Sequence, residues 1–133
     1  YKAEFLLART ENIYVEERIE EDYFVAGIEW AEREGAQIAS VSLGYKDWYQ
    51  FNDYNGRTAF ITFGATRAAQ HGMLLCIANG NEGDEGIGAP ADARHVLSVG
   101  SVTAGGAKAS FSSVGPTADG RLKPDLATLG VNI

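Results

Sequence analysis

LLCIANGNEG, residues Leu74–Gly83, joins an apolar run to a polar turn punctuated by glycine. The run is long enough for a buried β-strand, and in an open α/β sheet such a strand ends at the carboxyl edge, where ligands and reacting groups collect. Asn81 follows Gly80 and precedes Glu82, in backbone that glycine frees for unusual φ/ψ values. A carboxamide NH₂ held there can donate a hydrogen bond to a developing oxyanion. A Gly-Asn turn without chemistry is the alternative interpretation.

The composition is that of an ordinary globular domain. With 133 residues, 45% of them hydrophobic and 22% charged, the chain can form one modest core in a single domain. A net charge of -7 argues against a nucleic-acid partner, which would favour clustered Lys and Arg. No run approaches the roughly 18 consecutive apolar residues of a membrane helix, so we expect no membrane partner. The single cysteine, Cys76, cannot form an internal disulfide and is expected to be a buried small hydrophobe.

Strand and helix patterns alternate along the chain. We expect strands at 3–8, 37–43, 73–78 and 96–102, helices at 22–34 and 59–71, and an edge strand at 109–113. Another short apolar run follows Lys123-Pro124-Asp125. Alternation with connections of this length implies parallel pairing and right-handed crossovers. The sequence therefore predicts an α/β fold in which a parallel sheet is flanked by helices.

Each predicted helix carries an apolar stripe at helical spacing. The first stripe comprises Tyr23, Ala26, Gly27, Trp30 and Ala31, and the second comprises Phe60, Phe63, Gly64, Arg67 and Ala68. Small Ala26 and Gly27 would let the first helix pack closely on a sheet. Thr58 can cap the second helix, and His71 falls in its last turn, where a cation suits the helix dipole. We therefore expect no catalytic role for His71, and His95 has no partner motif.

Two polar segments are expected to be loops. Between Thr10 and Asp22 lie six carboxylates, which indicates a solvated loop running into the acidic first turn of a helix. The stretch 47–56 is polar and aromatic and lies between a strand and a helix. Its Asp47, Asp53 and Asn55 lack the spacing of a calcium-binding EF-hand loop, so a plain surface loop is preferred to a calcium site.

Parallel strands place the loops that follow them at one edge of the sheet. Ser42-Leu43-Gly44 and Gly80-Asn81-Glu82 should therefore be neighbours in space. In this order, the two loops resemble those of the subtilisin-like serine proteases (subtilases, peptidase S8 type). The segments that carry this resemblance are Gly27–Ala31, the strand ending at 42–44, Ala78–Gly83, Ala89–Ala91, Val99–Val102, Ala109–Pro116 and Lys123–Ala127. They cover nearly the whole chain, and Asp47–Gly56 resembles an insertion.

The resemblance implies a subtilisin-like, three-layer α/β fold, of which residues 1–133 would be a single partial domain, the central part of a catalytic domain. It implies a secreted or cell-envelope endopeptidase that cleaves polypeptides through an Asp-His-Ser triad and a covalent acyl-enzyme. No cofactor is implied for this segment, although a structural calcium ion is possible in the parent protein.

Site residues follow from the resemblance position by position. Asn81 would donate its side-chain amide to the oxyanion. Ser42, Leu43 and Gly44 would pair through their backbone with extended substrate. Other positions would shape the pocket for the residue before the scissile bond: a wall from Ala78, Asn79 and Gly80, a base near Gly88, and a rim at Glu82 that favours basic or polar side chains. Asn79 stands where a small Ala or Ser is commoner in the family.

The family's three triad segments do not occur in this sequence. There is no Asp-Thr-Gly, no His-Gly-Thr and no Gly-Thr-Ser, and Ser112 and Ser113 lack the helix-start context of the nucleophile. We therefore expect this chain alone to be inactive while its parent is active. We also expect exposed sheet edges and apolar faces to cause self-association.

Two other interpretations remain open. The first is a non-catalytic, subtilase-like binding or assembly module. The second is an unrelated flavodoxin-like ligand-binding domain, which would need a phosphate-compatible first loop that this chain does not show.

Overall fold

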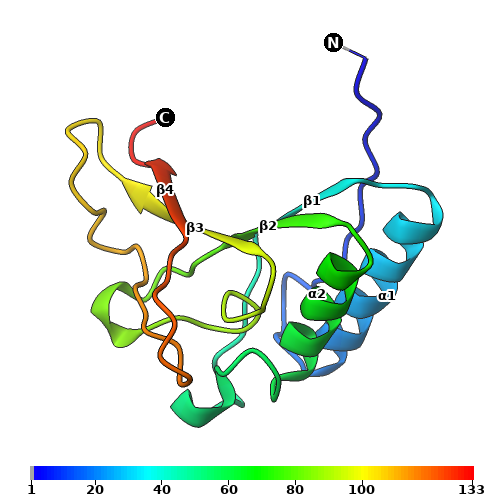
Figure 1. The fold of residues 1–133 in the computed structure, drawn as a ribbon, viewed down its shortest axis with the longest axis horizontal. Coiled ribbons are helices and arrows are strands. Elements are labelled where there is room, and N and C mark those ends of the chain that lie inside the picture. The colour runs from blue at the N-terminus through cyan, green and yellow to red at the C-terminus, as the bar shows by residue number, and fades with distance from the viewer. Residues whose placement is uncertain (1) are drawn as a thin grey trace.

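A computed structural model describes residues 2–133 and shows a parallel β-sheet with two α-helices (Figure 1). The elements in chain order are α1 (Ile19–Arg33), β1 (Ile38–Val41), the 3₁₀ turn η1 (Phe51–Asp53), α2 (Phe60–Gln70), β2 (Leu74–Ala78), the 3₁₀ turn η2 (Gly83–Glu85), β3 (Leu97–Val102) and β4 (Leu126–Leu129). The four strands lie in the order β1-β2-β3-β4, and all three pairs are parallel. This confirms the predicted α/β fold.

The two faces of the sheet differ in what covers them. Val41, Leu75 and Ile77 point toward the helices and are buried in the core. Ile38 and Leu74 are register partners on the opposite face, and they are 65% and 41% exposed. Figure 1 shows α1 and α2 on the same side of the sheet. Within residues 2–133, the helices therefore cover one face and leave the other open.

Both helices lie close to their predicted ranges but bury different faces from those expected. On α2 the buried side chains include Ile61, Ala65 and Ala68, whereas Phe60 and Phe63 are roughly half exposed. On α1 the core residue is Phe24, and its neighbour Tyr23 is exposed. The predicted stripes were wrong at Tyr23, Phe60 and Phe63, because the residue one position along the helix, Phe24 or Ile61, faces the core instead. Ala68 of the second stripe is buried as expected, and Ala31 of the first stripe packs against the core.

Close packing between the helices depends on Gly64. A Cβ atom at this position would lie 2.7 Å from Val25 Cγ2 on α1. Gly27 was expected to pack on the sheet, but the nearest atoms to its missing side chain belong to Ala8 and Thr10 in the N-terminal segment. Gly27 therefore admits a neighbouring chain segment instead of a strand.

Two predicted strands are not found in the described residues. Residues 3–8 form no strand, and Phe5 and Leu7 are largely exposed. Residues 109–113 form a turn, in which Ser112 N–H donates to the carbonyl of Ala109. Ser112 and Ser113 are buried in this turn, and their hydroxyls accept hydrogen bonds from the N–H groups of Ser101 and Glu82 respectively. The alternating sequence pattern therefore does not correspond to a strand here.

Hydrogen bonds join the acidic segment at the start of α1 to the aromatic loop at 47–56. Glu20 and Glu21, expected in a solvated segment, are buried at the start of α1. The hydroxyl of Tyr49 donates to Glu21 Oε1 at 2.6 Å and accepts from the N–H of Phe60 at 3.0 Å. The predicted loop at 47–56 is confirmed, although Tyr49 and Tyr54 lie in the core.

Asp92 anchors the far end of this loop. Its buried carboxylate accepts hydrogen bonds from Gly56 N–H and the Thr62 hydroxyl, and its carbonyl accepts one from Arg121. Burial raises the pKa of Asp92, although the hydrogen bonds from Thr62 and Gly56 oppose that rise. Across residues 2–133, no group of three or more His, Cys, Asp or Glu residues is arranged to hold a metal ion.

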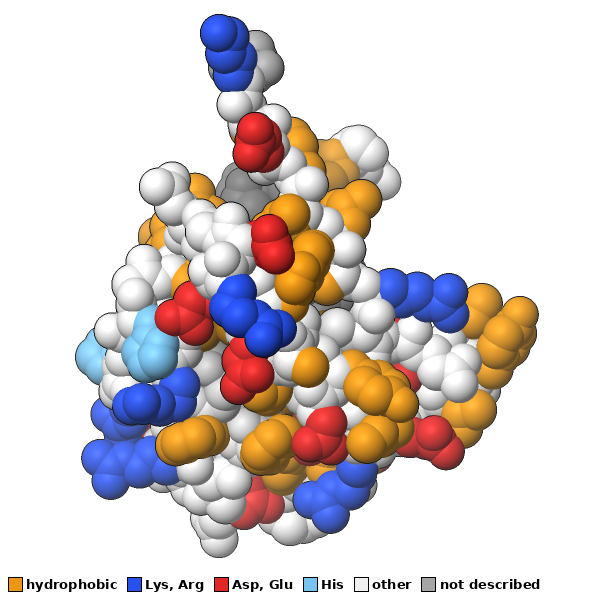
Figure 2. Space-filling view, turned by 90° about the vertical axis from the view of Figure 1, so that its right-hand side faces the viewer, with side chains coloured by type: hydrophobic (Ala, Val, Ile, Leu, Met, Phe, Trp, Pro, Cys, Tyr) orange, Lys and Arg blue, Asp and Glu red, His pale blue; other side chains and the backbone are white. Residues whose placement is uncertain are grey.

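The surface on the helical side mixes charge and apolar area. Figure 2 shows Lys and Arg interspersed with Asp and Glu, together with scattered hydrophobic side chains. In the part of the chain that the structure describes, no helix is both long and apolar enough to cross a membrane.

Replacing Gly64 with Ala should destabilise the chain. The new methyl group would crowd Val25, and overpacking of this kind costs about 1–3 kcal/mol. That cost opposes a gain in helix propensity of up to about 1 kcal/mol. Urea unfolding should show a lower midpoint for G64A than for the wild type. The double variant V25A/G64A should be more stable than V25A alone, and a G64A chain as stable as the wild type would contradict the close contact.

The purified 133-residue chain should self-associate at micromolar concentration. Ile38, Leu74 and Leu126 are exposed on strands of the sheet, and apolar surface of this kind drives association when nothing covers it. Sedimentation velocity should show species larger than a monomer. Replacing Ile38 and Leu74 with Thr should shift the distribution toward monomer, and a single monomeric species for the wild-type chain would contradict this prediction.

Candidate functional site

The carboxyl ends of β1 and β2 lie side by side at one edge of the sheet. Val41 is paired with Ile77, so Ser42 and Ala78 continue their strands at the same level. The loops that follow, 42–44 and 79–82, are thus neighbours, as the sequence predicted. An open depression of about 330 Å³ lies on the sheet face that the helices leave uncovered, and Ser42 and Asn81 both border it.

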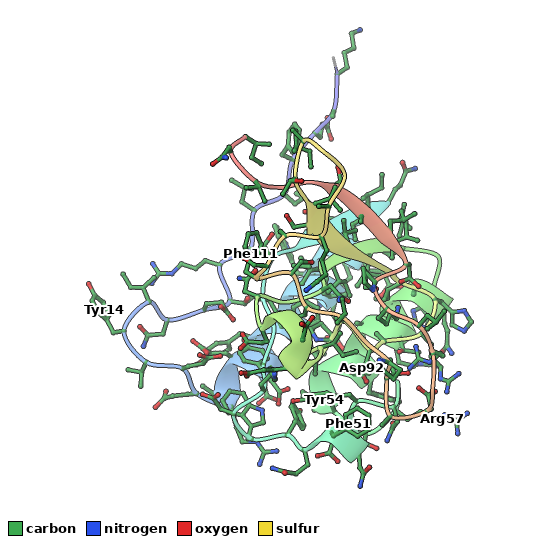
Figure 3. The ribbon with its side chains drawn as sticks, turned by 90° about the vertical axis from the view of Figure 1, so that its left-hand side faces the viewer. Tyr14, Phe51, Tyr54, Arg57, Asp92 and Phe111 are labelled. Atoms are coloured by element: carbon green, nitrogen blue, oxygen red, sulfur yellow. The ribbon has the colours of Figure 1, made fainter. Side chains whose placement is uncertain are left out.

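Small and neutral side chains line the depression. All four strands contribute to its floor, with Ser40, Cys76, Val99, Ser101 and Thr128 among the lining residues. Phe111 closes one side, and Figure 3 shows this ring well separated from Asp92 and Tyr54, which lie among the loops at the other end of the molecule. No His, Lys, Arg, Asp or Glu borders the depression within residues 2–133. The polar side chains that border it within residues 2–133 are therefore hydroxyls, amides and one thiol.

Asn81 presents a free carboxamide at this rim. The residue is exposed, and none of the hydrogen bonds formed among residues 2–133 uses its side chain. The turn that carries it requires glycine on both sides, because Gly80 has φ of 110° and Gly83 has φ of 57°. Asn81 thus borders the depression with a side chain that is not engaged by the rest of the described chain.

Asn79 has a different environment from the one expected for a pocket wall. It borders the depression, but it is only 1% exposed. Its Nδ2 donates to the carbonyl of Ser113 at 2.6 Å, and its Oδ1 is buried with no partner among the described residues. The side chain of Asn79 therefore serves as an internal anchor.

The structure brings five of the nine predicted site residues to the depression: Ser42, Ala78, Asn79, Gly80 and Asn81. The other four lie nearby without bordering it. Leu43 packs against the core, and Glu82 is exposed beyond the turn. A Cβ on Gly44 would lie 3.2 Å from the Ala89 carbonyl, and one on Gly88 would lie 3.1 Å from the Tyr45 carbonyl. Gly44 and Gly88 thus allow two backbone segments to meet behind the 42–44 loop.

The two histidines lie elsewhere. His71 ends α2, and its Nδ1 is 2.8 Å from Glu32 Oε1 on α1. His95 precedes β3 with φ of 63°. Neither is among the residues that border the depression.

The sequence analysis did not predict that the loop 111–114 forms hydrogen bonds with the turn that carries Asn81. Gly83 N–H donates to the Phe111 carbonyl at 2.8 Å, and Val114 N–H donates to the Gly83 carbonyl at 3.2 Å. Ser113 adds two further hydrogen bonds to the turn. The available signal was the pair of serines before Val114 and Gly115, which we interpreted as part of an edge strand.

Comparison with known proteins gives a consistent result. The family model described as "Subtilase family" matches residues 3–132. The thermostable alkaline protease of Halalkalibacterium halodurans is 32% identical over 107 residues, which cover 80% of this chain and 26% of that protein. Subtilisin DY of Bacillus licheniformis is 37% identical over 95 residues, covering 68% and 31% respectively. Serine protease AprX of Bacillus subtilis is 31% identical over 125 residues, covering 82% and 28%.

Solved structures show the same likeness. The prenylagaramide maturation protease PagA superposes with a TM-score of 0.60 at 31% identity, over 72% of this chain and 33% of that one. The self-cleaved protease domain of PatA superposes with a TM-score of 0.60 at 28% identity, over 73% and 35%. The chain thus spans about a quarter to a third of the length of these relatives. Because the family match extends over residues 3–132, the chain belongs to the subtilase family.

Proposed function

We propose that this chain supplies the oxyanion-binding turn and part of the peptide-binding cleft of a serine endopeptidase, as the central part of its catalytic domain. One observation carries the proposal. The carboxamide of Asn81 is exposed at the end of β2, beside the end of β1, on the rim of a depression that both loops border. Family membership supports a serine protease-type domain, and the geometry supports the role of this residue within it.

Asn81 would act in the step that forms the tetrahedral intermediate. When a nucleophile attacks a peptide carbonyl, the carbonyl oxygen gains negative charge, and a fixed donor stabilises that charge more than it stabilises the ground state. A neutral amide suits a depression without charged side chains, because no nearby counter-ion competes for its hydrogen bond. In a subtilisin, loss of such a donor lowers turnover by about 10²–10³-fold.

The end of β1 would receive the peptide. Within residues 2–133, β1 lies at an edge of the sheet, and Ser42 and Gly44 beyond it are exposed. An extended peptide can add to such an edge through main-chain hydrogen bonds. Leu43 would pair through its backbone while its side chain stays in the core. Glu82, exposed just beyond the turn that carries Asn81, would favour basic or polar side chains in the substrate.

This part of the active site needs a nucleophile and a base from elsewhere in the protein. The sequence has none of the three triad segments, and the depression has no histidine or carboxylate on its lining. The proposal assigns no cofactor to these residues, and a structural calcium ion in the parent stays a prediction. A secreted or cell-envelope location likewise follows from the family resemblance alone.

The purified 133-residue chain should not react with a fluorophosphonate probe, because it lacks an activated serine. The whole protein should be labelled at one serine outside this segment, as shown by mass spectrometry of the labelled peptide. Labelling of the isolated chain would contradict the assignment of an incomplete site. A folded whole protein that is neither labelled nor able to cleave casein would favour the non-catalytic binding module.

Replacing Asn81 with Ala in the whole protein should lower kcat by about 10²–10³-fold with little change in KM, because the amide acts on the transition state. Steady-state cleavage of a chromogenic peptide measures both constants. Asn52 offers a matched control, since it is an exposed asparagine in η1 that lies away from the depression. N52A should match the wild type, and an N81A enzyme with unchanged kcat would refute the catalytic role.

A further inference from the structure

We propose that Ser113 is a positioning residue that aims the Asn81 carboxamide by holding the peptide groups on both sides of it. This inference rests on the proposed function, since it assigns a role within the same oxyanion site. The hydroxyl of Ser113 is not presented to the depression as a nucleophile would be, because the residue is fully buried.

Ser113 makes two hydrogen bonds that flank Asn81. Its N–H donates to the Gly80 carbonyl at 3.0 Å, which belongs to the peptide group before Asn81. Its Oγ accepts from the Glu82 N–H at 2.9 Å, which belongs to the peptide group after Asn81. Each peptide group is planar, so the backbone at Asn81 can rotate only about φ and ψ. Holding both planes fixes these two angles and therefore the direction of the Cα–Cβ bond.

The carboxamide depends on this backbone restraint. No residue between 2 and 133 forms a hydrogen bond with the Asn81 side chain, so no side-chain contact fixes its direction. Gly80 and Gly83 permit the turn through their positive φ values, but glycine by itself has the greatest backbone freedom of any residue. The restraint must come from outside the turn.

Ser113 is itself held firmly. Its carbonyl accepts the 2.6 Å hydrogen bond from Asn79 Nδ2, and the next residue, Val114, donates to the Gly83 carbonyl. Its Oγ also fills the space beside Gly80, because a Cβ there would lie 2.8 Å from this oxygen. Asn79, Gly80 and Ser113 therefore interlock. This explains what an amide side chain at residue 79 does in a position where the family more often has a small residue.

A double-mutant cycle in the whole protein tests the proposal. S113A should lower kcat about 10-fold with KM unchanged, less than the loss of the donor itself. In the N81A background, the same substitution should change kcat by less than about 2-fold, because the group that it aims is gone. A Ser113 with a merely structural role would lower kcat equally in both backgrounds, and that result would overturn the proposal.

Ser98→Ala is the matched control. Ser98 is also fully buried, and its hydroxyl donates to Asp125 Oδ2 at 2.9 Å, away from the turn. S98A should lose comparable stability but keep kcat within about 2-fold of the wild type. If S113A fails to fold, Asn79→Ala serves as the second variant. It removes the bond to the Ser113 carbonyl, so it should lower kcat about 3-fold only when Asn81 is present.

Amide hydrogen exchange provides a readout that does not depend on activity. Removing the Ser113 hydroxyl should accelerate exchange at Glu82 N–H about 10-fold or more, while amides of β2 keep their protection. If the wild-type protein cleaves no peptide, the proposed function fails, yet faster exchange at Glu82 still supports the restraint. Unchanged exchange at Glu82 in a folded S113A protein would overturn the proposal whether or not the protein is an enzyme.

Discussion

Parallel pairing of β1 with β2 determines where the helices, the core and the site lie. Two consecutive parallel strands need a crossover, which α2 provides here. Parallel pairing also sends the loops after both strands to the same edge. Within residues 2–133, both helices pack on one face of the sheet and leave the opposite face open beneath those loops. The register between Val41 and Ile77 then decides which residues meet at the rim, and a shift of one residue would turn them to the other face.

The site achieves its polarity without charge. Its rim carries amide and hydroxyl groups, and the acidic side chains of this strongly acidic chain lie elsewhere. Fixed dipoles of this kind need a rigid frame, because a donor that can rotate away loses most of its effect on a reacting group. The hydrogen bonds between the loop 111–114 and the turn at 79–83 form such a frame. The rigidity thus comes from backbone contacts between segments about 30 residues apart.

The sequence predicted the features that depend on local patterns. Apolar runs ending in glycine gave the strands and helices, and their alternation gave the parallel topology. The position of Asn81 beyond a strand end was sufficient to predict that the residue lies at the carboxyl edge of the sheet. The helix faces were predicted less well, because α2 shows two competing stripes and only the fold decides that Ile61 and Ala65 face inward instead of Phe60 and Phe63.

Features that depend on distant partners could not be predicted from local patterns. The burial of Glu21 depends on Tyr49, 28 positions along the chain, and a run of carboxylates otherwise indicates solvent. The role of Ser113 depends on Glu82, 31 positions away. In each case the local sequence is typical of a different structure, a solvated segment for Glu21 and an edge strand for Ser113. The observed structure depends on a hydrogen bond to a residue that is distant in the sequence.

The hydrogen bonds between the loop 111–114 and the Asn81 turn couple ligand binding at the turn to the local stability of the loop. Thermodynamic linkage is reciprocal. If the ordered loop favours binding at the turn by a given coupling free energy, then binding at the turn stabilises the ordered loop by the same free energy. Occupancy of the depression would therefore protect the connection between β3 and β4 against local opening, although that connection lies mostly outside the site. Conversely, sequence changes that loosen this connection would weaken binding without touching the ligand. Stability and recognition in this domain share one set of hydrogen bonds.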